Sequence, residues 1–326
     1  MASSLRSGCW CPQDSAAKVV RISDTSQAKD ISKPLLLNGY ARLHSFRINK
    51  SLSWIPDPLP SLPAAKALGC DPSESEVATV LQLAACNLRC WYCFVDYASL
   101  EPTTSSSEFI SSDHVIDSIA GDHVKMVLDL SGGNPGLIPE WILSFVQSLR
   151  RRNTDNIYLW ADDNLTVNYY SQYLSRQDID IIATFPYFGS VGCFKGYSPQ
   201  SFSFNTGMLP ELFANQFEVF RSYLSYGWDI YAYVTFTTPA LSNLLSEMSS
   251  FVDTLQEIDI NLPLRTVPLE IIPYTPMLSR LNDMRRLSMK NQYIVLEAWK
   301  KEVTGRFSQD DRVTSIERIR YASRRV

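Results

Sequence analysis

The feature that most limits the possible folds is a series of short β-rich apolar runs that begins at residue 77 and alternates with helical patterns. The six runs occupy residues 77–84, 124–131, 156–162, 180–185, 228–236 and 267–273. The helical patterns lie near 138–152, 168–177, 212–226 and 241–257. Strands that alternate with helices predict parallel pairing with right-handed crossovers. We therefore expect an α/β fold, a partial (β/α)6 TIM-like barrel, although the pattern alone fits a flat doubly wound sheet equally well.

The chain divides into three regions that differ in the periodicity of their apolar residues. Residues 1–76 show weak periodicity and a proline cluster at 54–63, which predicts an irregular N-terminal extension. Residues 77–279 carry the alternating pattern and form the expected core barrel, and residues 280–326 form a helical C-terminal extension. With 326 residues, of which 45% are hydrophobic, the chain is long enough to bury a large core.

Charge and hydropathy exclude several classes of partner. Residues 77–279 carry 9 basic and 21 acidic side chains, whereas residues 280–326 carry 12 basic and 6 acidic ones. An acidic body argues against duplex nucleic acid, because that binding depends on phosphate neutralisation by Lys and Arg. No apolar run approaches the roughly 20 residues that span a bilayer, and the first residues lack an apolar secretory signal. We expect a cytoplasmic protein with no membrane partner.

Three cysteines directly follow the first predicted strand. Cys86, Cys90 and Cys93 form a C-x3-C-x2-C pattern, and parallel folds place ligands at the carboxyl ends of strands. Thiolates suit zinc or an iron–sulfur cluster. Zinc would need a fourth ligand, and the nearest histidines, His114 and His123, show no paired spacing. A four-iron cluster on three cysteines would instead leave one iron open for chemistry.

The cysteine motif resembles the signature of the radical S-adenosylmethionine superfamily, C-x3-C-x-aromatic-C, matched here by Cys86, Cys90, Tyr92 and Cys93. The resemblance implies a [4Fe–4S] cluster whose open iron binds the amino and carboxylate groups of S-adenosyl-L-methionine. It further implies cleavage of that cofactor to a 5′-deoxyadenosyl radical, which abstracts a substrate hydrogen. Tyr92 would lie beside the adenine. A reductant such as flavodoxin or ferredoxin would supply the electron.

A glycine motif after the second predicted strand supports the same resemblance. It consists of Ser131, Gly132, Gly133, Asn134 and Pro135, and it is similar to the GGEP motif of the superfamily. Glycine lets the backbone approach a ligand closely. Asn134 stands where the family often has glutamate, so its amide oxygen keeps a hydrogen-bond acceptor and loses the charge. The resemblance implies that this loop binds S-adenosylmethionine.

Polar residues also follow the third and fourth predicted strands. Asp162, Asp163 and Asn164 occupy a place where the family has polar groups near the cofactor or substrate, although a helix N-cap would explain them as well. Lys195 is a candidate partner for a carboxylate of cofactor or substrate. Its segment resembles a K-G-x5-F-x3-T-G pattern of small, core-only members, carried by Lys195, Gly196, Phe202, Thr206 and Gly207.

The remaining candidates have weaker support from the sequence. Near the sixth predicted strand, Glu270, Tyr274 and Arg280 are possible substrate contacts. The cysteines outside the motif match no auxiliary-cluster spacing and are expected to be free thiols, namely Cys9, Cys11, Cys70 and Cys193.

Together these patterns predict a radical S-adenosylmethionine enzyme that acts on a small-molecule substrate, with its catalytic residues beyond the cofactor site unassigned. One alternative is a protein-directed activity, either activation of a glycyl-radical enzyme or modification of a ribosomally made peptide. Another alternative is a metal-binding scaffold without catalysis.

Overall fold

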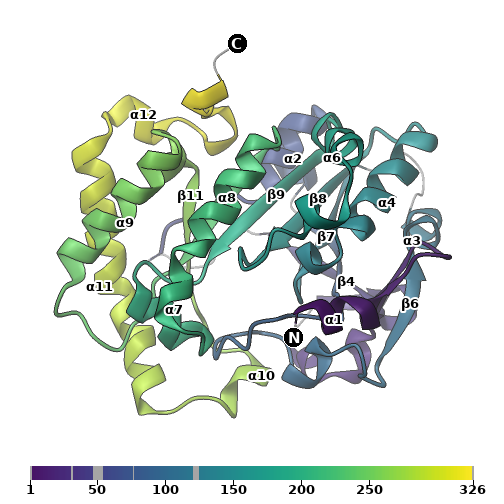
Figure 1. Cartoon of the computed structure of the whole chain (residues 1–326), viewed down its shortest axis with the longest axis horizontal. Coiled ribbons are helices and arrows are strands. Elements are labelled where there is room, and N and C mark those ends of the chain that lie inside the picture. The colour runs from purple at the N-terminus through teal and green to yellow at the C-terminus, as the bar shows by residue number, and fades with distance from the viewer. Residues whose placement is uncertain (1, 31, 47–53, 76, 120–124, 325–326) are drawn as a thin grey trace.

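The computed structural model describes residues 2–30, 32–46, 54–75, 77–119 and 125–324 (Figure 1). Within these residues the main sheet has eight strands in the order β11-β10-β9-β8-β7-β5-β4-β3. The strands are β3 (Ser32–Leu36), β4 (Ala41–Ser45), β5 (Val77–Leu81), β7 (Met126–Leu130), β8 (Ile157–Asp163), β9 (Phe188–Phe194), β10 (Ile230–Thr235) and β11 (Thr266–Leu269). The six strands from β5 to β11 pair in parallel, and β4 and β3 are antiparallel additions beside β5.

This architecture confirms the predicted α/β class and the parallel sheet. The described sheet does not close into a barrel, because β11 and β3 are its two edges. Five of the six predicted runs contain a strand, and only residue 124 of the second run lies outside the described residues. The limits of the three predicted regions stay a prediction.

The fourth predicted strand, residues 180–185, is wrong. These residues belong to α6 (Arg176–Ala183) and the turn after it, and the fourth parallel strand is β9. The helix begins with a capping box between Ser175 and Asp178, and it buries Ile179 and Ile182 one turn apart. The real strand is hard to see in the sequence because it contains Gly189, Ser190 and Gly192, which are depleted in strands or neutral.

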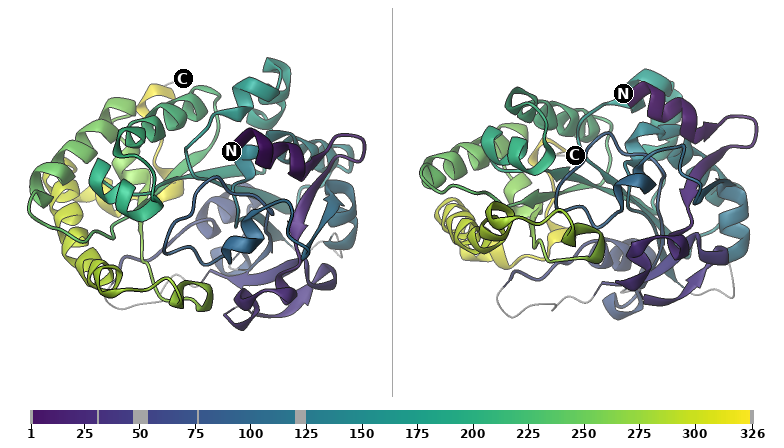
Figure 2. Two further views of the ribbon diagram at one scale, coloured as in Figure 1. Left: turned by 60° about the horizontal axis from the view of Figure 1, so that its bottom comes forward. Right: turned by 90° about the horizontal axis from the view of Figure 1, so that it is seen from below.

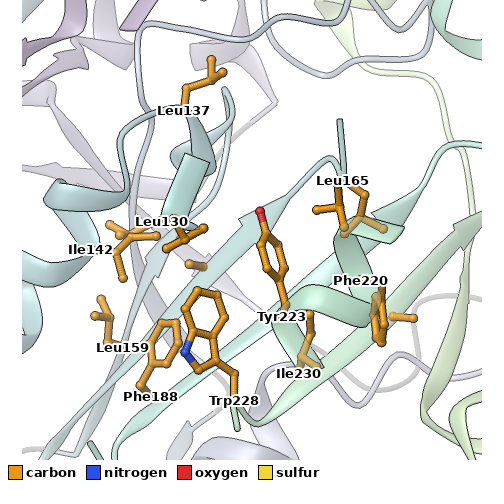
Figure 3. Close-up of a cluster of buried hydrophobic side chains, with 14 of the residues drawn as sticks. Leu130, Leu137, Ile142, Leu159, Leu165, Phe188, Phe220, Tyr223, Trp228 and Ile230 are labelled. Carbon is orange, nitrogen blue, oxygen red and sulfur yellow. The ribbon is translucent and has the colours of Figure 1, made fainter. Parts of the chain in front are cut away.

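Helices cover the outer face of the parallel sheet. They are α4 (Pro139–Arg151), α5 (Tyr169–Tyr173), α6, α8 (Asn215–Ser225) and α9 (Leu244–Ile258). Figure 3 shows the packing between this face and the helices, where Leu130, Leu159 and Ile230 of the strands meet Ile142 and Phe220 of α4 and α8. The residues in this core are fully or almost fully buried.

The inner face of the sheet packs on itself and on α2 (Ser61–Leu68). Along β8, Ile157, Leu159 and Ala161 belong to the outer core, whereas Tyr158 and Trp160 belong to the inner one. Both faces are therefore buried, which is why the strand reads as a continuous apolar run in the sequence. Ala64 and Leu68 of α2 complete the inner core.

The first 76 residues contain more regular structure than their sequence indicates. Besides β3, β4 and α2, they form α1 (Ala2–Cys9), β1 (Trp10–Cys11) and β2 (Ala16–Val20), and β2 pairs with β6 (Ser107–Ser111). The proline-rich segment runs beside β11, where the indole Nε1 of Trp54 donates to the carbonyl oxygen of Pro268 at 2.9 Å. Figure 2 shows the N-terminal elements on the opposite side of the molecule from α9 and α11.

The C-terminal region is helical, as predicted. Residues 280–326 contain the long α11 (Asp283–Arg306) and α12 (Gln309–Val313), and α11 packs against α9 (Figure 1). The short α10 (Thr275–Leu278) precedes them, within the predicted core region. Two further helices, α3 (Ser112–Ile119) and α7 (Pro199–Thr206), follow β6 and β9.

Gly189 provides a test of the corrected fourth strand. A Cβ atom at Gly189 would lie 2.0 Å from Tyr158 Oη and 3.1 Å from Trp160 Cζ3, both on the neighbouring strand β8. We expect Gly189→Ala to lower the free energy of unfolding by roughly 1–3 kcal/mol, because overpacking forces side chains out of their rotamers. Gly305→Ala is the control, since its Cβ meets nothing within 4 Å in α11. Equal stability of both variants in urea denaturation would contradict this placement of β9.

Candidate functional site

Four loops meet at the carboxyl end of the parallel sheet. The cysteine loop follows β5, the glycine loop follows β7, Asp162 to Asn164 end β8, and Lys195 directly follows β9. Because the strands run in parallel, their carboxyl ends lie at the same edge. The corrected fourth strand thus still places Lys195 where the sequence predicts it.

The cysteine loop is fixed by hydrogen bonds to its backbone. The amide of Cys86 donates to Leu100 O at 3.2 Å, and the amide of Cys93 donates to Cys90 O at 3.0 Å. The hydroxyl of Tyr97 donates to Cys90 O at 3.0 Å. All three thiols of this loop are free.

The thiols of the loop lie in a water-poor environment with a nearby cation. Burial raises the pKa of Cys86 to about 11 and that of Cys90 to about 12, and it raises the pKa of Cys93 as well. The ammonium of Lys195 opposes these shifts at all three thiols. A bound cationic metal centre would favour the thiolate forms in the same direction.

The donors of this loop are three free thiols, which suit an iron–sulfur cluster or zinc. In the described ranges, no three His, Cys, Asp or Glu side chains are grouped to bind one metal ion. A [4Fe–4S] cluster makes a different demand, because each cysteine binds a separate iron and the sulfur atoms stay apart. His114 lies on α3, beside β6, and His123 lies outside the described residues.

Asn205 joins the cysteine loop to the loops after β9 and β10. Its carbonyl oxygen accepts from Trp91 N at 3.2 Å, and its Oδ1 accepts from Trp91 Nε1 at 3.1 Å. Its Nδ2 donates to Lys195 O at 2.9 Å and to Thr237 O at 3.2 Å. Sequence reasoning missed Asn205, although it directly precedes Thr206 of the predicted pattern.

The rest of that pattern has a local structural role. Gly196 lies against α7, where a Cβ would be 2.5 Å from Phe202 N, and Gly207 ends the helix with φ +73°. Tyr92, the predicted neighbour of the adenine, has its hydroxyl 3.1 Å from Thr235 Oγ1 at the end of β10. The two glycines of the pattern therefore shape the turn before α7 and the end of that helix.

The glycine loop packs against protein backbone. Gly132 and Gly133 have positive φ, and a Cβ at Gly133 would lie 2.3 Å from Leu83 O and 2.7 Å from Ala85 O. The amide of Asn134 donates to Ala85 O at 2.7 Å. The close approach that requires glycine at position 133 is thus to the segment before Cys86, and Pro135 begins the turn that follows.

Asn134 and Asn164 connect the glycine loop, the end of β8 and the cysteine loop. Asn134 Oδ1 accepts from the amide of Asn164 at 3.1 Å, so this oxygen already has a protein donor, whereas Nδ2 is buried without a partner. Asn164 Nδ2 donates to Asn87 Oδ1 at 2.9 Å and lies 3.6 Å from Cys86 Sγ. Asn164 thus supports a predicted metal ligand directly.

Asp162 and Asp163 face opposite sides of β8. Asp162 Oδ2 accepts from Ser131 Oγ at 2.7 Å, and its Oδ1 accepts from Trp160 Nε1 at 3.2 Å. Burial raises the pKa of Asp162, and Lys195 opposes the shift. Burial alone would lower the pKa of Lys195, but the neighbouring Cys193 and Tyr92 raise it above its ordinary value.

The three candidates after the sixth strand point in different directions. Glu270 accepts from the hydroxyl of Tyr293 on α11 at 2.7 Å. Tyr274 packs on Phe94, with ring centroids 6.1 Å apart. Arg280 donates to Cys93 O at 2.8 Å and to Val95 O at 2.6 Å, so it supports the cysteine loop.

The cysteines outside the motif are all free thiols. Cys9 donates to Ala84 O at 3.3 Å, two residues before Cys86, and burial raises its pKa to about 12. Cys193 belongs to the inner core. Cys11 and Cys70 lie beside β2 and after α2.

Comparison with known proteins gives partial structural likenesses. No family model and no curated protein matches the chain. The model is similar to SuiB of Streptococcus suis bound to S-adenosylmethionine, at 15% identity and a TM-score of 0.42, over 67% of this chain and 46% of that one.

Two further solved structures show the same level of likeness. One is anSMEcpe with bound AdoMet, at 14% identity and a TM-score of 0.40, over 58% of this chain and 48% of that one. The other is SuiB bound to the precursor peptide SuiA, at 16% identity and a TM-score of 0.40, over 67% of this chain and 45% of that one. The chain spans less than half the length of the structures it matches here.

Asp163 gives the site a pH-dependent stability. Burial raises its pKa from 3.8 to about 7, although Leu165 N and the Tyr223 hydroxyl donate to it. The folded state therefore binds this proton more tightly than the unfolded state, and the stability from Asp163 falls as pH rises from about 4 to about 7. We expect Asp163→Asn to be more stable than the wild type at pH 7, with the difference vanishing near pH 4.

Thermal denaturation from pH 4 to pH 8 measures this effect. Asp310→Asn, an exposed carboxyl on α12, is the control and should follow the wild-type profile. If the melting temperatures of Asp163→Asn and the wild type changed in parallel with pH, ionisation of Asp163 would not destabilise the folded state, and the prediction would be wrong.

Proposed function

We propose that the chain is a radical S-adenosylmethionine enzyme. The observation that carries the proposal is that three cysteines spaced C-x3-C-x2-C lie on the loop after the first parallel strand, beside Lys195 and against the glycine loop. When bound, a [4Fe–4S] cluster with S-adenosylmethionine would supply a 5′-deoxyadenosyl radical for hydrogen abstraction. Cys86, Cys90 and Cys93 would bind the cluster.

The residues of the chain would orient the cofactor and keep water away. Trp91 is 2% exposed and packs edge-on against Tyr92 and Phe204, which makes the wall of the cysteine loop apolar. Lys195 would offer its ammonium to the cofactor carboxylate. The side-chain oxygen of Asn134, Oδ1, already accepts from the amide of Asn164, whereas Nδ2 has no partner. A hydrogen bond from Asn134 to the cofactor would therefore be donated by Nδ2.

For the substrate, we propose a small molecule that enters at the carboxyl edge of the sheet. The second candidate is a peptide, as in the SuiB structure bound to the precursor peptide SuiA. Deuterium transfer from labelled candidate substrates into 5′-deoxyadenosine distinguishes a small molecule from a peptide. Transfer only from a labelled peptide would exclude the small-molecule substrate. The same proposal includes flavodoxin or ferredoxin as the reductant. It also includes a cytoplasmic location, and it excludes duplex nucleic acid as a partner. Among the described residues, no helix is long and apolar enough to cross a membrane.

Replacement of one motif cysteine tests the cluster. We expect the anaerobically reconstituted wild type to contain about four irons per chain, and Cys90→Ala to lose both the cluster and the formation of 5′-deoxyadenosine. Cys70→Ala is the control, because Cys70 lies after α2 and away from the motif loop. Stoichiometric zinc without iron uptake in the wild type would exclude radical chemistry and favour a metal-binding scaffold.

Replacement of Gly133 tests the contact between the glycine loop and the cysteine loop. Gly133→Ala would clash with Leu83 O and Ala85 O, so the loop must move, and we expect affinity for S-adenosylmethionine to fall more than about tenfold, which is about 1.4 kcal/mol. Gly207→Ala is a matched control, because Gly207 has a similar φ of +73° but open space around its Cβ. Equal cofactor affinity in the two variants, measured by equilibrium dialysis, would reject this role for Gly133.

A further inference from the structure

Three charged side chains point into the interior of the sheet below the cysteine loop. On β4, Ala41 belongs to the outer core, so the next residue, Arg42, faces the inner side. On β7, Leu128 and Leu130 belong to the outer core, and Asp129 between them faces the inner side. Asp162 on β8 bonds to Ser131 and Trp160, and Trp160 is an inner-core residue.

Two of these side chains are buried without their full set of partners. Arg42 is 7% exposed and Asp129 is 4% exposed. Arg42 Nε and Asp129 Oδ1 have no hydrogen-bond partner, and neither residue forms an ion pair within 4 Å with another described residue. An unpartnered buried charge is more costly than an unpartnered buried neutral group, so Arg42 and Asp129 are the pair that a bound molecule would stabilise most.

A second buried arginine shows how the fold supplies acceptors to the Nη atoms of a guanidinium, although its Nε, like that of Arg42, has no hydrogen-bond partner. Arg265 is 3% exposed, and its Nη atoms donate to the Asp229 carboxylate and to the carbonyls of Ile230 and Ile319. It also packs on the Tyr231 ring, 3.9 Å from the centroid. Among the described residues, the Nη atoms of Arg42 have no such set of acceptors, and this is the difference between the two arginines.

The charges of Arg42 and Asp129 are near one another but not in contact. In the register of the sheet, Arg42 pairs with Val80 and Val80 pairs with Asp129, so one strand separates them. Burial lowers the pKa of Arg42, and the carboxylates of Asp129 and Asp162 oppose that shift. Burial and the neighbouring Asp162 raise the pKa of Asp129. A guest between the two side chains could neutralise both.

The interior site lies directly under the cofactor site. The Arg42 guanidinium is 5.7 Å from the ring centroid of Phe94, the residue after Cys93, and Phe94 packs on Tyr274. Asp162 connects the site to Ser131 of the glycine loop. A molecule bound here would therefore lie below the residues that, in the proposed function, bind the cluster and S-adenosylmethionine.

We propose that Arg42 and Asp129 bind the α-amino acid group of the substrate, with its carboxylate on Arg42 and its ammonium on Asp129. The inference rests on the proposed function and names the substrate class of that same site. A guanidinium binds a carboxylate through two parallel hydrogen bonds, and a carboxylate accepts from an ammonium. A simple anion would be repelled by Asp129 and Asp162, and a simple amine would leave Arg42 unpartnered. A zwitterion satisfies both side chains at once.

Calorimetric titration of the full, reconstituted chain with each of the 20 proteinogenic L-amino acids tests the proposal. We expect at least one to bind, and its carboxamide and its N-acetyl derivative to bind at least about tenfold more weakly, since a hydrogen bond to a charged group contributes roughly 1.5–3 kcal/mol. Arg42→Gln should abolish the preference for the acid over the carboxamide. Asp129→Asn should abolish the preference for the free amine over the N-acetyl form.

The controls separate this site from general damage and from the cofactor chemistry. Arg221→Gln removes an exposed arginine from α8 and should keep both preferences. If Arg42→Gln does not fold, as judged by circular dichroism, the preference measured on Asp129→Asn alone decides. Iron content and cofactor binding are measured on the same samples, so their loss would count against the proposed function and not against the interior site. Absence of binding by all 20 amino acids, or both preferences unchanged in the variants, would overturn the inference.

Discussion

The backbone from Leu83 to Ala85 is the segment on which the geometry of the site depends. It leaves β5 and receives the glycine loop on one side, where Asn134 N donates to Ala85 O. On the other side the amide of Ala84 donates to Lys18 O of β2 at 2.9 Å. The cysteine loop thus begins from a backbone that two separate parts of the chain position, at the strand where the antiparallel and parallel parts of the sheet meet.

Lys195 links the thiols to the carboxylates electrostatically. Its ammonium lowers the pKa of Cys86, Cys90 and Cys93 against the effect of burial, and it does the same for Asp162 and Asp163. One cation on the loop after β9 therefore favours the anionic forms of groups from two other loops. Its surroundings in turn raise its own pKa, so the arrangement is mutually stabilising.

Much of this site could be predicted from the sequence because its residues stand directly after apolar runs. The cysteines, the glycine loop and Asn164 occupy such places, and the strands they follow are apolar because both faces are buried. Lys195 follows β9, whose pattern is not apparent in the sequence. The fourth strand was hidden because Gly189 and Gly192 make room for Tyr158 and Phe220, which is a tertiary requirement with no local signal. Arg42 and Asp129 escaped notice because a single charge in a strand pattern usually marks a solvent-facing position.

The contact between Trp54 and Pro268 has a consequence for how the molecule behaves beside copies of itself. β11 is an edge of the sheet, and in a strand the N–H and C=O of one residue point to the same side. Since Pro268 O accepts from Trp54, the missing N–H of the proline lies on that same outer side. At this position the edge offers no donor, and its acceptor is already occupied. A strand from a second molecule could not pair at this position, so this edge of the open sheet is protected here against edge-to-edge aggregation.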